Sequence, residues 1–418
     1  MNRWQRFLAP LIYLPNIMPL KAVFSAEIFP WAFLYTLRKD LKITLPLAGF
    51  LLYISASALW GLTGSSTLLG QARSLFALFN ATLIFFVLIN IKTAEYRFLL
   101  RVFEWVFFIN IALCFVQYLG LFPQALDALF RLFIDRFTAE IYGGGRGVAG
   151  LFAEPSYASM SIHYYFALFM LNRRINPKSS QGLILIAALI LFDLFIIRSI
   201  TGLVMIGFYL ASIQRAKDLL RAGGILLAIL IWVVAQFGTS PNAPRSIEAA
   251  YDFFRYENYQ DPQPWLLEQS GFRFVSVWAS YKYGLFHPLG AGVGKWGPAS
   301  IQAMDDVGVK ASAMSFFATA MGAEYQGVRP TAFGAGLMLE TGIVGLLLFA
   351  FALFPYVARK ELYTWSHSRS VMVFFFFNVF ALGSIGDPLP FIVLGLTIRT
   401  VFPPEGEPVL IGEEERIG

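Results

Sequence analysis

The chain has 418 residues, of which 57% are hydrophobic and only 14% are charged, and its formal net charge is +6. Soluble proteins carry about 25% charged residues, so this composition excludes an ordinary soluble domain and indicates a polytopic membrane protein. The chain has a single cysteine, Cys114, which excludes an intrachain disulfide.

Apolar stretches suited to crossing a bilayer recur along the chain. A span takes about 20 apolar residues at roughly 1.5 Å each. The predicted spans are 7–20, 22–37, 41–60, 72–91, 102–122, 154–171, 182–198, 200–213, 222–238, 331–356, 370–385 and 388–402. Re-entrant segments are an alternative for the second, eighth and twelfth. The predicted fold is an all-α polytopic membrane protein with about 12 transmembrane helices.

Lys and Arg residues are spread unevenly over the predicted loops. If both ends of the chain lie in the cytoplasm, 18 of the 32 Lys and Arg residues fall on that side, and the short external loops hold five. This asymmetry follows the positive-inside rule and accounts for most of the net charge. The basic composition is therefore no sign of a nucleic-acid partner.

Two external loops divide the predicted spans into blocks. The predicted organisation is N-terminal transmembrane helices in 1–122, a loop with an amphipathic helix in 123–153, central transmembrane helices in 154–238, a large loop in 239–330, C-terminal transmembrane helices in 331–402 and a cytoplasmic tail in 403–418. The large loop is nearly neutral and rich in aromatic residues. That composition suits a folded lid that packs on lipid and stacks on sugar rings.

The most informative segment is Arg146-Gly147-Val148-Ala149-Gly150-Leu151-Phe152-Ala153-Glu154-Pro155-Ser156, where the sixth span begins. Three more glycines precede it, so the backbone can approach a ligand closely. Pro155 suits the first turn of a helix, and Glu154 complements the positive helix end. The arrangement predicts a site for an anionic headgroup at the membrane face.

Other short motifs follow in a defined order relative to the spans. They are Ser199-Ile200-Thr201-Gly202, Gly271-Phe272-Arg273 to Trp278, His287-Pro288-Leu289-Gly290-Ala291-Gly292-Val293-Gly294 and Glu340-Thr341-Gly342-Ile343-Val344-Gly345. Together with the segment from Arg146 to Ser156 they resemble the Wzy-type O-antigen or exopolysaccharide polymerases, in the superfamily shared with the O-antigen ligases. Such polymerases carry an Arg, ten residues and a Gly in each major periplasmic loop. Here Arg136 pairs with Gly147, and Arg273 pairs with Gly284.

The resemblance implies a GT-C-like fold in the bacterial inner (cytoplasmic) membrane, with its active site facing the periplasm. A polyprenyl-diphosphate-linked glycan is the implied donor. A hydroxyl of a second lipid-linked repeat unit attacks its anomeric carbon, and polyprenyl diphosphate leaves. The implied partners are the donor and acceptor glycans, membrane lipids and a chain-length co-polymerase. No cofactor is expected, because the sequence shows no phosphate-binding loop, dinucleotide fingerprint or zinc spacing. No metal is expected either, because the pair Asp305-Asp306 suits a solvated turn.

Physical chemistry also points to arginines as site residues. Departure leaves charge on the diphosphate, and guanidinium groups bind phosphate oxygens bidentately. Such a cation lowers the barrier most when it is already oriented toward the developing charge. The candidate catalytic arginines are Arg146, Arg273 and Arg329, and the candidate substrate-binding residues are Arg73, Arg136, Glu154 and Lys295.

Several of these candidates have a purely structural alternative. Arg73, at the outer end of the fourth span, could extend to the bilayer interface, and Arg136 could solvate the amphipathic helix. Lys295 could be a solvated loop residue. Glu154 could cap the sixth span or pair with Arg146. These alternatives remain open from the sequence alone.

The general base is not assigned by the sequence. A His or a carboxylate within reach of the acceptor hydroxyl is expected, and His287 and Glu324 in the large loop are the candidates. His163 is expected to pack inside the bundle, and His367 is predicted to lie in the cytoplasm. Glu340, near the start of a span, suits a structural role.

Two other functions fit the same sequence. O-antigen ligases resemble one another in a His shortly before the Glu-x-Gly-x-x-Gly motif, whereas this chain has no His between Arg329 and Phe333. That difference favours a polymerase over a ligase. A polysaccharide transporter would place charges near the bilayer midplane, but the charges here gather at the predicted outer face.

Overall fold

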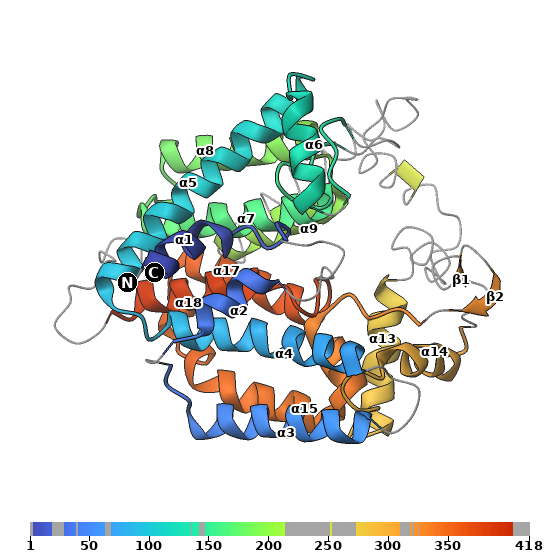
Figure 1. Ribbon diagram of the computed structural model, residues 1–418. Helices are drawn as coiled ribbons and strands as arrows, with labels where there is room; N and C mark the ends of the chain where they lie inside the picture. Colours follow the sequence, from blue (N-terminus) through green and yellow to red (C-terminus); the bar gives the residue numbers. More distant parts are fainter. Residues whose placement is uncertain are drawn as a thin grey trace.

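The computed structural model describes residues 3–18, 29–38, 41–62, 68–134, 136–141, 147–213, 251–252, 273–309, 318–319, 322–325 and 327–403. Within these ranges the regular secondary structure is helical, apart from one antiparallel pair of short strands and an isolated bridge between Ile17 and Ile134. Figure 1 shows most helices stacked side by side, with α13 steeply inclined across one end of the stack.

The helices of the first half are α1 (Arg3–Leu11), α2 (Pro30–Thr36), α3 (Leu45–Gly61), α4 (Leu68–Leu88), α5 (Thr93–Tyr118), α6 (Gln124–Phe133), α7 (Pro155–Asn172), α8 (Ser180–Phe192) with its π-helical extension η1 (Asp193–Ile197), and α9 (Ile200–Ile213). The later elements are α13 (Arg273–Phe286), α14 (Trp296–Asp306), β1 (Ala318–Thr319), β2 (Gly322–Tyr325), α15 (Phe333–Val357), α16 (Glu361–Thr364), α17 (Ser366–Phe380) and α18 (Leu389–Val401).

Long apolar helices confirm the expectation of a helical membrane protein. In the described part of the chain, four helices are long and apolar enough to cross a membrane: α4, α5, α8 with η1, and α15. Shorter apolar helices are α3, α9 and α18. The predicted span 222–238 lies outside the described residues, so a total of about twelve spans stays a prediction.

The first predicted span, 7–20, is wrong in its extent. Helix α1 ends at Leu11, and the chain continues through turns to Met18. Pro10 and Pro15 explain this end, because proline lacks the backbone N–H that a continuing helix needs. Within the second predicted span, the described helix is only α2.

Helix α7 is packed on all sides by protein. It contacts α5, α9, α17 and α18, and most of its residues are buried. Its polar side chains bond inside the bundle: Asn378 Nδ2 on α17 donates to the Tyr164 hydroxyl at 2.9 Å, and His163 Nδ1 lies 2.8 Å from the Ser159 carbonyl oxygen. His163 is therefore a packed bundle residue, as expected. Burial against protein lets a polar helix lie within a membrane domain.

Helix α15 is broken at Gly342, and a glycine-rich loop crosses the break. Gly342 has φ 65 and ψ −169, which is not helical. The carbonyls of Leu339 and Glu340 lie next to the break and accept from loop N–H groups, those of Ala291 at 3.0 Å and Gly292 at 2.8 Å. The loop thus replaces helical hydrogen bonds that the break removes.

The break gives a test of the fold. We expect Gly342→Ala to destabilise the protein by at least about 1–3 kcal/mol, because only glycine adopts this backbone conformation at low cost. An added Cβ would also lie 2.1 Å from the Pro288 carbonyl oxygen. Reversible unfolding in mixed micelles measures the change.

The matched control for this test is Gly49→Ala in α3, where an added Cβ meets nothing within 4 Å. We expect this substitution to be neutral or to stabilise by up to about 1 kcal/mol, since glycine is a poor helix former. Equal stabilities for the two variants would contradict the role assigned to the break.

Candidate functional site

A cavity of about 380 Å³ lies where the loops at one end of the helical stack meet. Its wall is built from the turns after α1, the starts of α7, α13 and α14, the segment before α15 and the connection from α17 to α18. The lining residues are Pro15, Asn16, Met18, Phe29, Arg136, Ala153, Glu154, Tyr157, Ser161, Arg273, Trp296, Gly327, Val328, Arg329, Pro330, Thr331, Gly383, Ser384, Ile385 and Asp387.

Three arginines from distant parts of the chain line this cavity. Arg136 follows α6, Arg273 begins α13, and Arg329 precedes α15. Backbone pairing between Ile17 and Ile134 ties the turns after α1 to the segment that holds Arg136. Three cations in one cavity favour an anionic ligand with several charged oxygens.

Arg273 has a nearby carboxylate in the same wall. Its Nη2 lies 3.6 Å from Glu154 Oε1, and its side chain is 37% exposed. Glu154 is the N-cap residue of α7, but its side chain makes no capping hydrogen bond. The pair is long and partly exposed, which leaves the guanidinium able to bind other oxygens.

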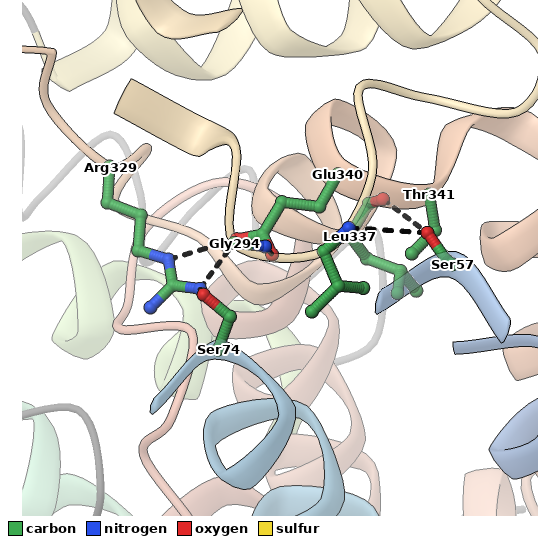
Figure 2. Close-up of polar contacts among 8 residues, drawn as sticks. Ser57, Ser74, Gly294, Arg329, Leu337, Glu340 and Thr341 are labelled. Carbon is green, nitrogen blue, oxygen red and sulfur yellow. Dashed lines mark hydrogen bonds and ion pairs between the residues drawn. The ribbon is translucent and has the colours of Figure 1, made fainter. Parts of the chain in front are cut away.

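Arg329 is held much more tightly. Its Nη2 lies 2.5 Å from Glu340 Oε1 and donates to the Ser74 hydroxyl at 2.6 Å, as Figure 2 shows. The guanidinium carbon lies 5.5 Å from the centre of the Trp296 ring. Arg329 is 8% exposed and Glu340 is fully buried. This arginine is therefore a cation whose orientation is set before any ligand arrives.

Glu340 connects Arg329 to the break in α15. Its Oε2 accepts from the N–H of Gly294 at 2.8 Å, at the end of the glycine-rich loop (Figure 2). Gly294 has φ 91, and an added Cβ would lie 2.6 Å from Gln71 on α4. The structural role expected for Glu340 is thus to hold the Arg329 guanidinium and the loop together.

The Arg146 segment packs against the turn between α8 and α9. The N–H groups of Gly147 and Val148 donate at 3.1 Å to the carbonyls of Ile197 and Ile196 in η1. An added Cβ on Gly147 would lie 2.0 Å from the Ile196 oxygen, so the motif needs glycine here. Arg146 itself lies outside the described residues.

Of the candidates with described side chains, three do not line the cavity: Arg73, His287 and Lys295. His287 follows the end of α13, and Arg273 begins it, so about 20 Å of helix separates them. His287 stacks on Tyr283 with ring centres 4.1 Å apart. Lys295 is the N-cap residue of α14, next to Trp296, and Arg73 neighbours Ser74 on α4. The side chain of Glu324 lies outside what the structure describes.

A carboxylate that the sequence analysis missed also lines the cavity. Asp387 stands between α17 and α18, is partly buried, and its Oδ1 accepts from the N–H of Leu389 at 2.9 Å. Burial raises the pKa of Asp387 to about 6, and the bond from Leu389 opposes that rise. The available signal was an acidic residue in the short connection between two predicted spans.

The cavity wall combines cations with aromatic rings. Tyr157 and Trp296 line it beside the arginines. Aromatic faces suit sugar rings, and guanidinium groups suit phosphates. Among the described residues, no group of three or more His, Cys, Asp and Glu is placed to hold a metal ion.

Comparison with family models, curated proteins and solved structures finds no match for this chain. A functional assignment therefore depends on the cavity and on the side chains that line it.

The buried ion pair predicts a large stability effect. We expect Glu340→Gln to destabilise the protein by about 3–5 kcal/mol, because it leaves the Arg329 guanidinium buried without its counter-charge. Reversible unfolding in mixed micelles measures the loss. The matched control is Glu104→Gln, whose partner Arg173 is 56% exposed. That change is expected to cost less than about 1 kcal/mol, and similar losses in both variants would contradict the assignment.

Proposed function

We propose that the protein is a membrane glycosyltransferase that polymerises polyprenyl-diphosphate-linked oligosaccharide repeat units on the periplasmic face. The observation that supports this function most strongly is the convergence of Arg136, Arg273 and Arg329 on one cavity. Arg136 lies 137 positions before Arg273, and Arg329 lies 56 positions after it, so their proximity is a product of the fold.

The three arginines would bind and stabilise the diphosphate of the donor. When the glycosidic bond to phosphate breaks, negative charge grows on the leaving group, and a cation already in place lowers that barrier. Arg329 is such a cation, because Glu340 and Ser74 hold its guanidinium. Arg273 is more exposed and can exchange its long contact with Glu154 for phosphate oxygens.

The surroundings of the cavity suit a substrate with a lipid tail. Helix α6 lies close in sequence to Arg136 and has no buried residue, and its Leu126, Leu129 and Leu132 are exposed. An amphipathic helix of this kind lies in the membrane interface. A diphosphate headgroup at that depth would reach the cavity while its polyprenyl tail stays in the bilayer.

The proposal predicts that Arg273→Ala lowers chain extension by about 100-fold or more, which is the usual cost of removing one group that stabilises transition-state charge. Extension is measured in proteoliposomes supplied with lipid-linked repeat units, extracted from cells in which this chain is deleted. The products are separated on a glycan ladder gel. Binding of farnesyl diphosphate, as a headgroup probe, should weaken in the same variant.

The control for this experiment is Arg131→Ala. Arg131 lies on α6, pairs with Asp127 at 2.8 Å and is 56% exposed, and it does not line the cavity. Its loss should leave the ladder unchanged. A normal glycan ladder from the Arg273→Ala variant would contradict the proposed site.

Two further outcomes would point to other functions. Transfer of the glycan to a final lipid acceptor without any ladder would indicate a ligase. Passage of labelled lipid-linked repeats across the bilayer without bond formation would indicate a transporter. In cells, deletion of a polymerase leaves single repeat units attached to the final acceptor, whereas deletion of a ligase leaves none attached.

A further inference from the structure

Two carboxylates are found among the residues that line the cavity, and they differ in their partners. Glu154 lies 3.6 Å from the Arg273 guanidinium, so its charge is partly compensated. Asp387 accepts from the backbone N–H of Leu389 at 2.9 Å and forms no ion pair with another described residue. Asp387 is therefore the lining carboxylate that no described arginine holds in an ion pair.

The segment that holds Asp387 is fixed against the rest of the cavity wall. The N–H of Gly383 donates to the Thr331 carbonyl at 2.5 Å, which joins this segment to the one that carries Arg329. An added Cβ on Gly336 of α15 would lie 2.4 Å from Ile385, so the two elements are in close contact. Asp387 thus has a defined position relative to the arginines, as a group that exchanges a proton with a bound substrate requires.

We propose that Asp387 is the general base that accepts the proton of the acceptor hydroxyl, a role that rests on the proposed function. The hydroxyl oxygen forms a bond to the anomeric carbon of the donor, and its proton moves to a carboxylate oxygen of Asp387. The bond from the anomeric carbon to the phosphate oxygen breaks. Its electron pair stays on the diphosphate, which Arg273 and Arg329 stabilise.

The environment of Asp387 agrees with this role. Burial raises the pKa of its carboxyl to about 6. A carboxylate with this pKa is ionised at neutral pH and is a stronger base than an ordinary aspartate. The titratable groups that face it on α7 are Tyr157, Tyr164 and Tyr165. The charged groups that share its cavity are Arg136, Glu154, Arg273 and Arg329.

Asp387 also has a structural task that a test must keep intact. It precedes Pro388, the N-cap residue of α18, and accepts from the N–H of Leu389, the first residue of that helix. Asn and Asp side chains both accept from a backbone N–H two residues on, and they have nearly the same shape. Asp387→Asn therefore preserves this bond and the packing, while it removes the charge and the ability to accept a proton.

The test compares Asp387→Asn, Asp387→Glu and the control Asp127→Asn, whose residue lies on α6 outside the cavity lining. Extension is measured from pH 5 to 8 with the extracted lipid-linked repeats, and headgroup binding is measured with farnesyl diphosphate. We expect Asp387→Asn to lose about 100-fold or more of the extension rate and to keep headgroup binding. Asp387→Glu should retain part of the rate with a shifted pH profile, and the control should match the wild type.

In the wild type, the rate should rise with pH through about 6 and then level off, because the base is active only when ionised. Wild-type extension with an unchanged pH profile in Asp387→Asn would overturn the assignment and leave only the structural bond to Leu389. That result would leave the polymerase proposal standing. If the wild type binds the headgroup probe but extends nothing, the proposed function fails, and the role of Asp387 fails with it.

Discussion

The ion pair between Arg329 and Glu340 is the interaction on which the candidate site depends. Glu340 stands two residues before Gly342, where the backbone of α15 is not helical. The glycine-rich loop fills the break with its own N–H groups, and Gly294 then holds the Glu340 carboxylate. A buried pair of this kind adds little net stability compared with apolar packing, but it fixes a charge in one orientation. The glycine-rich loop connects α13 to α14, so its attachment to α15 also helps to position Arg273 on α13 and Trp296 on α14.

Hydrophobic length and helix-starting residues predicted most of the long helices from the sequence. Helix α7 begins at Pro155, and α18 covers almost the whole of its predicted span. Such features are local, because a run of apolar residues and a proline are visible in a short window. The first span was predicted too long, since its prolines were outweighed by its apolar residues.

The candidate site was harder to predict, because it depends on distances across the fold. The sequence was enough to predict candidate arginines. The ion pair between Arg329 and Glu340 could not be predicted, because it depends on how the chain turns before α15. His287 was a candidate general base because it is the histidine of a loop motif. The length of α13 places it at the opposite end of that helix from Arg273, away from the cavity. Asp387 was overlooked because a short gap between two apolar runs reads as a simple connection. The sequence analysis identified both motifs that meet at the break in α15, His287 to Gly294 and Glu340 to Gly345. Nothing in the sequence showed that these two motifs are in contact.

The charges in and beside the cavity also suggest why the proposed base and several cations occur together. Arg329 is balanced by Glu340, and Arg273 is partly balanced by Glu154, so the wall is close to neutral before a ligand enters. A diphosphate adds negative charge, which the arginines take up. Negative charge near Asp387 favours its protonated form, because like charges disfavour ionisation. In the proposed reaction, compensation of the diphosphate by the arginines therefore also keeps the proposed base ionised and able to accept a proton.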